Sequence, residues 1–439
     1  MADLVLVNPP NYSDVPNWMK LPNLGLAYLA SALRKDGIDI KIIDACYMKM
    51  NKDEVIKKLE KLDPRIVGFY STSHQLRETV FLANEIKKRL GCFTILGGPH
   101  ITSDPQLVYS YKNFDMAFAG EGEITLPKAV KSILRNKKQK KIVYGKPPKN
   151  LNSLPFPAYD LISMKKNSLV TTHKNCSHVI ISRGCPFNCS FCSIENNPIR
   201  FRSADNIIRE INLLVDKYNT QSILFECSAF TLNKKQVLDL CKGLKGEHMD
   251  ISWSCATRCD LVDEEMIREM KKAGCYNINF GIESGSYNIR KIIGKDFTNS
   301  AIIKIFNLCK KYDISTGSYW MIGFPYETVN TIKETIDFSL KLNSDFASYL
   351  PVFIYPGTKI FHLAVKNGII KKDVWYKFID GHPAPIYLPA NLTEKDILNF
   401  LRVAYRKFYL RFSKISMLKK INFSMDIMHL KRLFMIGKL

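Results

Sequence analysis

Short apolar segments that end in glycine or in small polar residues recur along this 439-residue chain, with helix-like patterns between them. Strands that alternate with helices pair in parallel, so the pattern predicts an α/β fold built on parallel sheets. A doubly wound sheet binds its ligands at the carboxyl ends of the strands, where small polar loops let backbone approach a large flat ligand. In the first third of the chain, strands are expected at Leu4–Val7, Asp39–Asp44, Ile66–Tyr70, Thr94–Gly98 and Met116–Gly120.

A second series of strand-like segments begins near residue 179. Six strand–helix units predict a partial, open parallel barrel of the TIM type, with its chemistry at the carboxyl ends of the strands. These strands are expected at residues 179–182, 222–226, 251–255, 276–282, 316–323 and 347–354.

The alternation breaks between the two series, where six lysines and four prolines crowd one short stretch. This composition is typical of a solvated linker, and a polyanion contact is the weaker alternative. We therefore predict a Rossmann-like domain at residues 1–136, a basic linker at 137–157, the barrel at 158–380 and a basic helical extension at 381–439.

Three cysteines, Cys185, Cys189 and Cys192, follow the first strand of the predicted barrel in a C-x3-C-x2-C spacing. Thiolates so close on one loop can hold three irons of a [4Fe–4S] cube and leave the fourth iron open for another ligand. A structural zinc site is a weaker alternative, because zinc ligands usually come in pairs at longer intervals. A disulfide framework is weaker still, since the twelve cysteines are scattered and no signal peptide is expected at the start. The predicted location is therefore the reducing cytoplasm.

With the aromatic Phe191 before its last cysteine, the triplet resembles the hallmark of the radical S-adenosylmethionine (SAM) superfamily. The resemblance implies that SAM binds the open iron. It also implies that an external one-electron reductant, of flavodoxin or ferredoxin type, drives cleavage of SAM to methionine and a 5′-deoxyadenosyl radical. Besides the cysteines, it includes residues 256–258, 281–285, 323–328 and 355–358, within a span of 176–375.

A zwitterionic, ribose-bearing ligand such as SAM needs acceptors for its hydroxyls and ammonium and a cation for its carboxylate. Glu283, at the end of the fourth barrel strand, is the candidate acceptor, and Arg258, after the third strand, is the candidate cation. The alternative is that Glu283 pairs with Arg258 and only stabilises the barrel rim. The other expected SAM contacts are Ser228 at the ammonium, Phe191 beside the adenine, and the backbone of Met321, Ile322 and Gly323 at the adenine edge.

Some positions near these motifs depart from the family pattern or stay open. The acidic residues common after the second strand are missing, which leaves the role of Ser228 open. Tyr326 replaces a glycine of the usual Gly-x-Pro-Gly-Glu-Thr turn, and we take it as a candidate catalytic residue. Cys227, Cys255 and Cys259 also fall at strand ends, where an auxiliary cluster or hydrogen-atom donation competes with the favoured interpretation as small buried hydrophobes.

In detail, residues 22–30, 97–102 and 120–123 are similar to the cobalamin-binding domain that precedes the radical domain in one large class of the superfamily. The Asp-x-His-x-x-Gly signature is missing, so the resemblance implies cobalamin without a histidine ligand to cobalt; His100 is expected to hydrogen-bond the loop or a corrin side chain instead. An inherited fold that has lost its cofactor is the alternative. The expected contacts with cobalamin are Asn8, Pro10, Asn23, Gly25, Ser71, Thr72, Ser73, Gly97, Gly98, Pro99, His100, Gly120, Glu121 and Gly122.

The net charge of +23 predicts attraction to phosphates, anionic lipid or another acidic partner. The tail is the most basic part, since residues 402–439 contain ten Lys or Arg and one acid among many apolar residues. Its helical pattern from Thr393 fits a peripheral anchor on an anionic membrane, and it fits slightly better a helix that closes the barrel with its basic side in water. Nucleic acid ranks third, because no known binding module accompanies the charge.

Taken together, these features predict a cobalamin-dependent radical SAM enzyme that methylates an unactivated carbon of a small-molecule or lipid-like substrate. The resemblance implies that one SAM methylates cob(I)alamin, a second SAM yields the radical, and the substrate radical takes the methyl group from methylcobalamin. A radical SAM cyclase or rearrangement enzyme with the same cofactors is the second hypothesis. A metal-bearing protein that binds nucleic acid or anionic membrane through its basic surface is the third.

Overall fold

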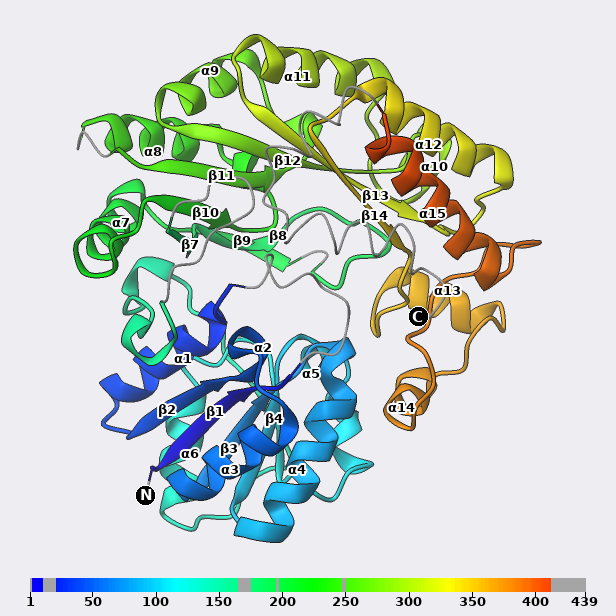
Figure 1. Cartoon of the computed structure of the whole chain (residues 1–439). Helices are drawn as coiled ribbons and strands as arrows, with labels where there is room; N and C mark the ends of the chain where they lie inside the picture. Colours follow the sequence, from blue (N-terminus) through cyan, green and yellow to red (C-terminus); the bar gives the residue numbers. More distant parts are fainter. Residues whose placement is uncertain (1, 11–20, 165–174, 195–196, 247–249, 412–439) are drawn as a thin grey trace. The chain divides into compact units, whose positions relative to one another are not determined.

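The computed structural model describes residues 2–10, 21–164, 175–194, 197–246 and 250–411 (Figure 1). The chain divides into two compact units, each with its own parallel sheet. The first unit comprises residues 1–165, 355–357 and 371–385, and the second comprises residues 166–354, 358–370 and 386–439.

The first unit contains a six-stranded parallel sheet in the order β2-β1-β3-β4-β5-β6. Its strands are β1 Leu4–Asn8, β2 Ile40–Asp44, β3 Ile66–Tyr70, β4 Phe93–Gly97, β5 Met116–Ala119 and β6 Ile142–Tyr144. Its helices are α1 Leu24–Lys35, α2 Ala45–Met48, α3 Lys52–Leu62, α4 Leu76–Leu90, α5 Pro99–Ser103, α6 Leu126–Leu134 and α14 Val374–Ile379.

Helices cover both faces of this sheet, and neighbouring residues of one strand serve opposite faces. Val5 and Val7 of β1 pack with α3 and α4 in one apolar core. Leu4 and Leu6 of the same strand pack with α1 and α6 in the other core. Because strand side chains alternate between faces, a sheet covered on both sides needs strands that are apolar throughout. This requirement explains the continuous apolar runs from which the strands were predicted, and the Rossmann-like prediction is confirmed.

The prediction of a solvated linker at 137–157 is wrong for part of its length. Residues 142–144 form β6, which pairs with β5 at the edge of the sheet. Further along, the N–H of Ala158 donates to the carbonyl of Ala27 at 3.0 Å, and Arg34 of α1 pairs with Asp160. The lysines and prolines dominate the composition, but the apolar residues among them pack on the first unit.

The predicted boundary of the barrel at residue 380 is also wrong, because residues 371–385 belong to the first unit. Trp375 of α14 is 1% exposed and lies in the same core as α3 and α4. Arg77 of α4 donates from Nε and Nη2 to the carbonyl of Phe378 at 3.1 and 2.7 Å, which satisfies the end of α14.

The second unit contains a six-stranded parallel sheet in the order β14-β13-β12-β11-β10-β7, which confirms the predicted open barrel. A two-stranded antiparallel hairpin, β8-β9, was not predicted. The strands are β7 Cys176–Ile180, β8 Ser182–Cys185, β9 Asn197–Phe201, β10 Ser222–Glu226, β11 Ser252–Thr257, β12 Cys275–Glu283, β13 Ser315–Ile322 and β14 Phe346–Pro351.

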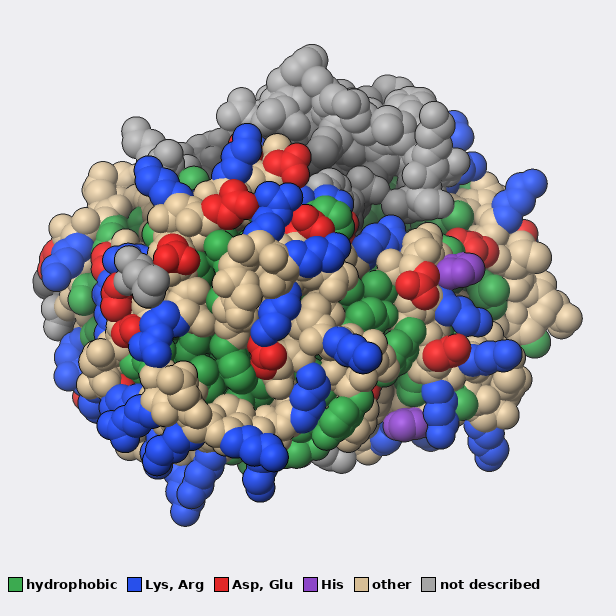
Figure 2. All heavy atoms as spheres, turned by 90° about the horizontal axis from the view of Figure 1, so that it is seen from below, with side chains coloured by type: hydrophobic (Ala, Val, Ile, Leu, Met, Phe, Trp, Pro, Cys, Tyr) green, Lys and Arg blue, Asp and Glu red, His purple; other side chains and the backbone are tan. Residues whose placement is uncertain are grey.

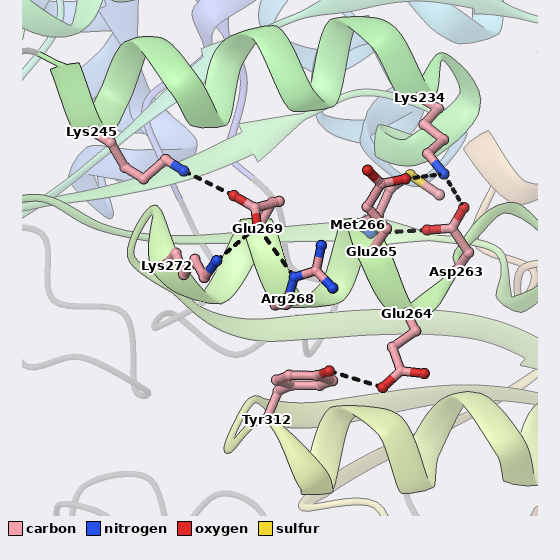
Figure 3. Close-up of polar contacts among 10 residues, drawn as sticks. All are labelled: Lys234, Lys245, Asp263, Glu264, Glu265, Met266, Arg268, Glu269, Lys272 and Tyr312. Carbon is pink, nitrogen blue, oxygen red and sulfur yellow. Dashed lines mark hydrogen bonds and ion pairs between the residues drawn. The ribbon is translucent and has the colours of Figure 1, made fainter.

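Helices line the outer face of this sheet (Figure 1), and polar contacts between surface side chains join several of them. Figure 3 shows Lys245 of α8 bound to Glu269 of α9, and Tyr312 beyond α11 bound to Glu264. Such exposed pairs contribute little each, so the apolar inner faces of the helices carry the packing. The helices are α7 Ala204–Tyr218, α8 Lys234–Gly246, α9 Glu264–Lys272, α10 Tyr287–Ile292, α11 Asn299–Lys311, α12 Val329–Leu342, α13 Lys359–Lys366 and α15 Glu394–Tyr409.

α15 covers the edge of the second sheet at β14, which is the last of the described strands in the sheet order. The hydroxyl of Tyr409 accepts from the N–H of Ala347 at 3.1 Å and donates to its carbonyl at 2.7 Å. The hydroxyl of Tyr405 does the same with Tyr349, at 3.1 Å in both directions. The prediction that the tail helix closes the barrel is confirmed for α15. The tail beyond residue 411 lies outside the described residues, and among those described no helix is both long and apolar enough to cross a membrane.

Candidate active site and cofactor sites

Cys185 ends β8, and Cys189 and Cys192 lie in the loop after it, which backbone contacts fix on two sides. The N–H of Ser190 donates to the carbonyl of Ile293 at 3.1 Å, and its carbonyl accepts from the N–H of Ile360 at 3.0 Å. Gly294 allows this approach: a Cβ there would lie 2.9 Å from the carbonyl oxygen of Asn188, and φ is +86°. The cysteine loop is therefore held in place by α10 and α13.

The thiols have the surroundings that a cluster needs. Cys189 is buried, whereas Cys185 and Cys192 are half-buried. Burial raises the pKa of the Cys189 and Cys192 thiols, and the positive charge of Lys295 opposes this shift at both. Metal ligation requires thiolates, so the positive charge of Lys295 favours the ligating form of these two thiols. Among the described residues, no group of three His, Cys, Asp or Glu side chains converges on a single ion; in a cube, each thiolate binds a different iron.

Arg258 lies beside the cysteine loop and contacts three side chains. Its Nε and Nη2 donate to the two carboxylate oxygens of Asp260 at 2.9 and 2.8 Å. Its Nη1 lies 3.7 Å from the Sγ of Cys189, and its guanidinium stacks 3.8 Å from the ring centroid of Phe187. The structure thus brings the predicted SAM cation to the cluster ligands.

The alternative that Glu283 pairs with Arg258 is wrong. Oε1 of Glu283 pairs instead with Nζ of Lys295 at 2.7 Å, and Nζ also donates to the carbonyl of Gly281 at 2.7 Å. Both side chains are almost fully buried. Glu283 ends β12 with a φ of +70°, a left-handed conformation that turns its side chain toward this partner. Lys295 carried no signal in the sequence, because its partner lies twelve residues away across a helix.

The other predicted SAM contacts lie at or just beyond the carboxyl ends of barrel strands. Ser228 is exposed in the bend after β10. Met321 and Ile322 end β13, and Gly323 follows with a φ of +105° and a Cβ position 3.0 Å from the carbonyl oxygen of Tyr387. Phe191 is half-buried and packs against Phe324 with ring centroids 5.6 Å apart. No contact with SAM follows from these positions alone, so these assignments stay predictions.

Tyr326 is held in a strained and exposed position in the turn after β13. Its φ is +67°, which explains why a glycine is usual there, and 67% of the residue is exposed. Glu327 beside it is buried, and its Oε2 accepts from the N–H groups of Gly323 and Phe324 at 2.7 and 2.9 Å. Burial raises the pKa of Glu327 to about 7, against the effect of these hydrogen bonds.

The other three cysteines named from the sequence fit the favoured interpretation, in which they are small buried hydrophobes. Cys255 and Cys259 are buried, Cys227 is half-buried, and burial raises the pKa of all three thiols. High pKa values keep thiols protonated and inert, as in apolar cores.

In the first unit, the predicted cobalamin loops follow β1, β3, β4 and β5 and therefore lie at one edge of the parallel sheet. Gln75 ties two of them together, because its Nε2 donates to Oδ1 of Asn8 and to the carbonyl of Pro9, both at 2.9 Å. These loops follow β1 and β3. The chain adds β2 on one side of β1 and β3 on the other, and ligands of such sheets usually bind in the crevice at this point. The sequence did not reveal Gln75, which lies outside every motif.

Gly98 permits a close approach between two of these loops. Its φ is +103°, and a Cβ there would lie 2.7 Å from both the nitrogen and the oxygen of Ser71. Gly25, Pro99 and Gly120 are exposed, so this edge presents backbone with little side-chain bulk. An exposed, glycine-rich edge fits a large flat macrocycle.

His100 is a buried residue of α5. The residue is 2% exposed, Nδ1 shares a hydrogen bond with the hydroxyl of Ser73 at 2.8 Å, and the ring packs on Trp375. Burial lowers its pKa to about 3. The expected loop hydrogen bond is present. The remaining predicted contacts divide into the buried Asn8, Pro10, Ser71, Ser73 and Gly122 and the half-buried Asn23, Thr72, Gly97, Gly98 and Glu121.

The positive net charge is not gathered at one place on the face that Figure 2 shows. Lys and Arg side chains are spread over this face with Asp and Glu among them. This distribution is typical of a solvated surface and gives no support to a nucleic-acid site there.

Two family models match the chain. Residues 179–339 match the Radical SAM superfamily, and residues 19–130 match the B12 binding domain. An uncharacterized methyltransferase of Pyrococcus horikoshii is 34% identical over 432 residues, which covers 93% of this chain and 92% of that protein. An anaerobic magnesium-protoporphyrin IX monomethyl ester cyclase of Rubrivivax gelatinosus is 24% identical over 437 residues, which covers 92% of this chain and 77% of that protein.

Solved structures show the same fold. The radical S-adenosylmethionine methyltransferase TsrM of Kitasatospora setae, solved with cobalamin and a [4Fe-4S] cluster, matches with a TM-score of 0.72 at 15% identity. The match covers 92% of this chain and 91% of that one. The two-sheet α/β architecture is therefore that of a known structure.

Proposed function

Because this chain belongs to the radical SAM superfamily, with a B12-binding domain before its radical domain, we propose that it methylates an unactivated carbon of a small-molecule substrate. The single observation that carries the proposal is the anchored three-cysteine loop of the second unit, in a chain that also has the glycine-rich edge of the first. When bound, the [4Fe–4S] cluster, SAM and cobalamin supply a 5′-deoxyadenosyl radical and a transferable methyl group.

The chain's own residues have distinct tasks in this proposal. Cys185, Cys189 and Cys192 hold three irons and leave the fourth for SAM. Lys295 keeps the carboxylate of Glu283 in place, and that carboxylate is the acceptor offered to SAM. The loops after β1, β3, β4 and β5 would hold the corrin ring, and His100 would not contact it, because the residue is buried beside Ser73 and Trp375.

Product analysis of SAM tests the proposal without knowledge of the substrate. Anaerobically reconstituted protein with SAM, hydroxocobalamin and a strong one-electron reductant is expected to form S-adenosylhomocysteine and 5′-deoxyadenosine. Omission of cobalamin should abolish the first product only, and Cys189→Ala should abolish 5′-deoxyadenosine. Formation of 5′-deoxyadenosine alone, with cobalamin bound, would contradict methyl transfer.

A cyclase or rearrangement enzyme is the second candidate, favoured by the likeness to the Rubrivivax gelatinosus cyclase. It uses the same cofactors and would give the result just named, without S-adenosylhomocysteine. A mere metal-bearing binding protein would give neither product.

We propose a small molecule as the substrate. Tyr326 is exposed beside the carboxyl end of β13, so it is our candidate for a substrate contact. A lipid-like substrate reached at an anionic membrane would need apolar surface on the tail, yet α15 buries Ile397, Leu401 and Phe408 against the barrel. The proposal therefore gives the membrane no role for the described part of the tail.

A further inference from the structure

Arg258 occupies a fixed position beside the cluster loop. It follows β11, and 7% of the residue is exposed. Asp260 binds the edge of the guanidinium formed by Nε and Nη2, at 2.9 and 2.8 Å. This bidentate grip leaves Nη1 on the opposite side, 3.7 Å from the Sγ of Cys189. The planar fork therefore aims one N–H at a predicted cluster ligand.

Two aromatic rings hold the plane of the guanidinium. Its Cζ lies 3.8 Å from the ring centroid of Phe187 and 5.6 Å from that of Phe297. Phe187 belongs to the same loop as Cys189, so the arginine and the cysteine loop are packed as one piece. Lysine cannot reproduce both the fork and the stacking.

The pair of Arg258 and Asp260 has no net charge, but its two charges lie at different distances from Cys189. Its positive end faces Cys189, and the carboxylate of Asp260 lies behind it. The Asp260 side chain is 30% exposed and that of Arg258 is 9% exposed, so water screens the carboxylate more than the guanidinium. Reduction adds one electron, and hence one negative charge, to a cluster. Hydrogen bonds to the sulfurs and nearby charge both set its potential.

We propose that Arg258 is a positioning residue that tunes the cluster: its Nη1–H donates to the Cys189 thiolate, and its buried charge makes the cluster easier to reduce. This inference rests on the proposed function only in requiring a [4Fe–4S] cluster on the three cysteines. In this proposal Arg258 acts on the cluster directly, whether or not SAM is bound. It therefore differs from a role at the SAM carboxylate.

The test is an electron paramagnetic resonance titration of the reconstituted holoprotein against applied potential, without SAM. Arg258→Gln is expected to lower the ratio of reduced to oxidised cluster about tenfold at a given potential, which equals about 59 mV for a one-electron couple. Asp260→Asn should shift the titration in the opposite direction, because it removes the negative charge behind the arginine. Arg268→Gln, an exposed arginine on α9 that pairs with Glu269, is the matched control and should not shift it.

Opposite shifts in the two variants support the proposal, because a merely structural ion pair would change both in the same way. Equal potentials in Arg258→Gln and wild type, or shifts of the same sign, would overturn it. If Arg258→Gln loses iron, Asp260→Asn decides: an upward shift supports the proposal, and no shift or a downward one refutes it. A wild-type protein that binds no cluster contradicts the proposed function instead, so the two failures are distinguishable.

Discussion

Two tyrosine hydroxyls complete the hydrogen bonds of the barrel's edge strand, so their removal should destabilise the second unit. Tyr409→Phe and Tyr405→Phe each delete one oxygen and keep the ring. Each deletion leaves one N–H and one carbonyl of β14 without its partner, at Ala347 and Tyr349 respectively. Both tyrosines are buried, with 6% and 3% of the residue exposed, so water does not easily replace the hydroxyl.

The magnitude follows from the cost of an unpaired buried polar group, about 1–3 kcal/mol. We expect each single variant to lose about 1–3 kcal/mol of the free energy of unfolding, with the larger loss at Tyr409, whose bond to the Ala347 carbonyl is the shorter at 2.7 Å. The two rings stack with centroids 6.2 Å apart, so the losses in the double variant need not add.

Urea unfolding of the iron-loaded protein under anoxic conditions measures the effect. Tyr312→Phe is the matched control, because its hydroxyl binds Glu264 at an exposed site (Figure 3) and its loss should cost about 0.5 kcal/mol or less. Unfolding midpoints of the two buried variants that coincide with the midpoint of Tyr312→Phe would refute the edge-strand argument.

Three further predictions concern the sites. Cys185→Ala, Cys189→Ala and Cys192→Ala should each abolish an iron content of about four per chain; zinc in place of iron, or full iron in any variant, would contradict the cluster. Gly98→Ala, whose methyl group would clash with Ser71, should weaken uptake of hydroxocobalamin in spectral titrations, whereas Gly91→Ala, with nothing within 4 Å, should not. Burial raises the pKa of Glu327 to about 7 from 4.5, so the folded state holds that proton more tightly and stability should fall as pH rises between these values. Glu327→Gln should remove this dependence, on the order of 3 kcal/mol, in urea unfolding at pH 5 and pH 8.

The strands were predictable because each must be apolar on both faces of a covered sheet, as Leu4 to Val7 show. The domain boundaries could not be predicted, because the composition of a segment shows its charge and proline content but not whether a few of its residues pack on a distant part of the chain. Trp375 is separated in the sequence from residues 1–165 by most of the barrel, and it still lies in the core of the first unit. Such long-range burial leaves no local pattern to detect.

The cysteine ligands were predictable from spacing alone, since three thiolates on one loop are close in any fold. The partners of the charged residues were not. The sequence places Glu283 and Arg258 at the ends of neighbouring strands, which makes their pairing an alternative to separate roles at SAM. In the structure, a turn after α10 brings Lys295 to Glu283, and Asp260, two residues from Arg258, takes the arginine. Neither the Arg258–Asp260 contact, two residues apart, nor the Glu283–Lys295 contact, across a helix, gives as clear a pattern in the sequence as two neighbouring strand ends.

Backbone strain separates two residues of the candidate site from the other described residues of the barrel unit. The non-glycine residues with positive φ in that unit are mostly Asn or Asp, which tolerate this conformation. Glu283 and Tyr326 are the exceptions among them, with φ of +70° and +67°. A left-handed conformation costs about 1–2 kcal/mol for such residues, and glycine would avoid most of it. Glu283 ends β12 and Tyr326 follows the neighbouring strand β13, so both lie at the edge where the site is predicted. Strain of this kind persists where the surroundings demand a particular side chain, which for Glu283 is the bond to Lys295 and for the exposed Tyr326 is our proposed substrate contact.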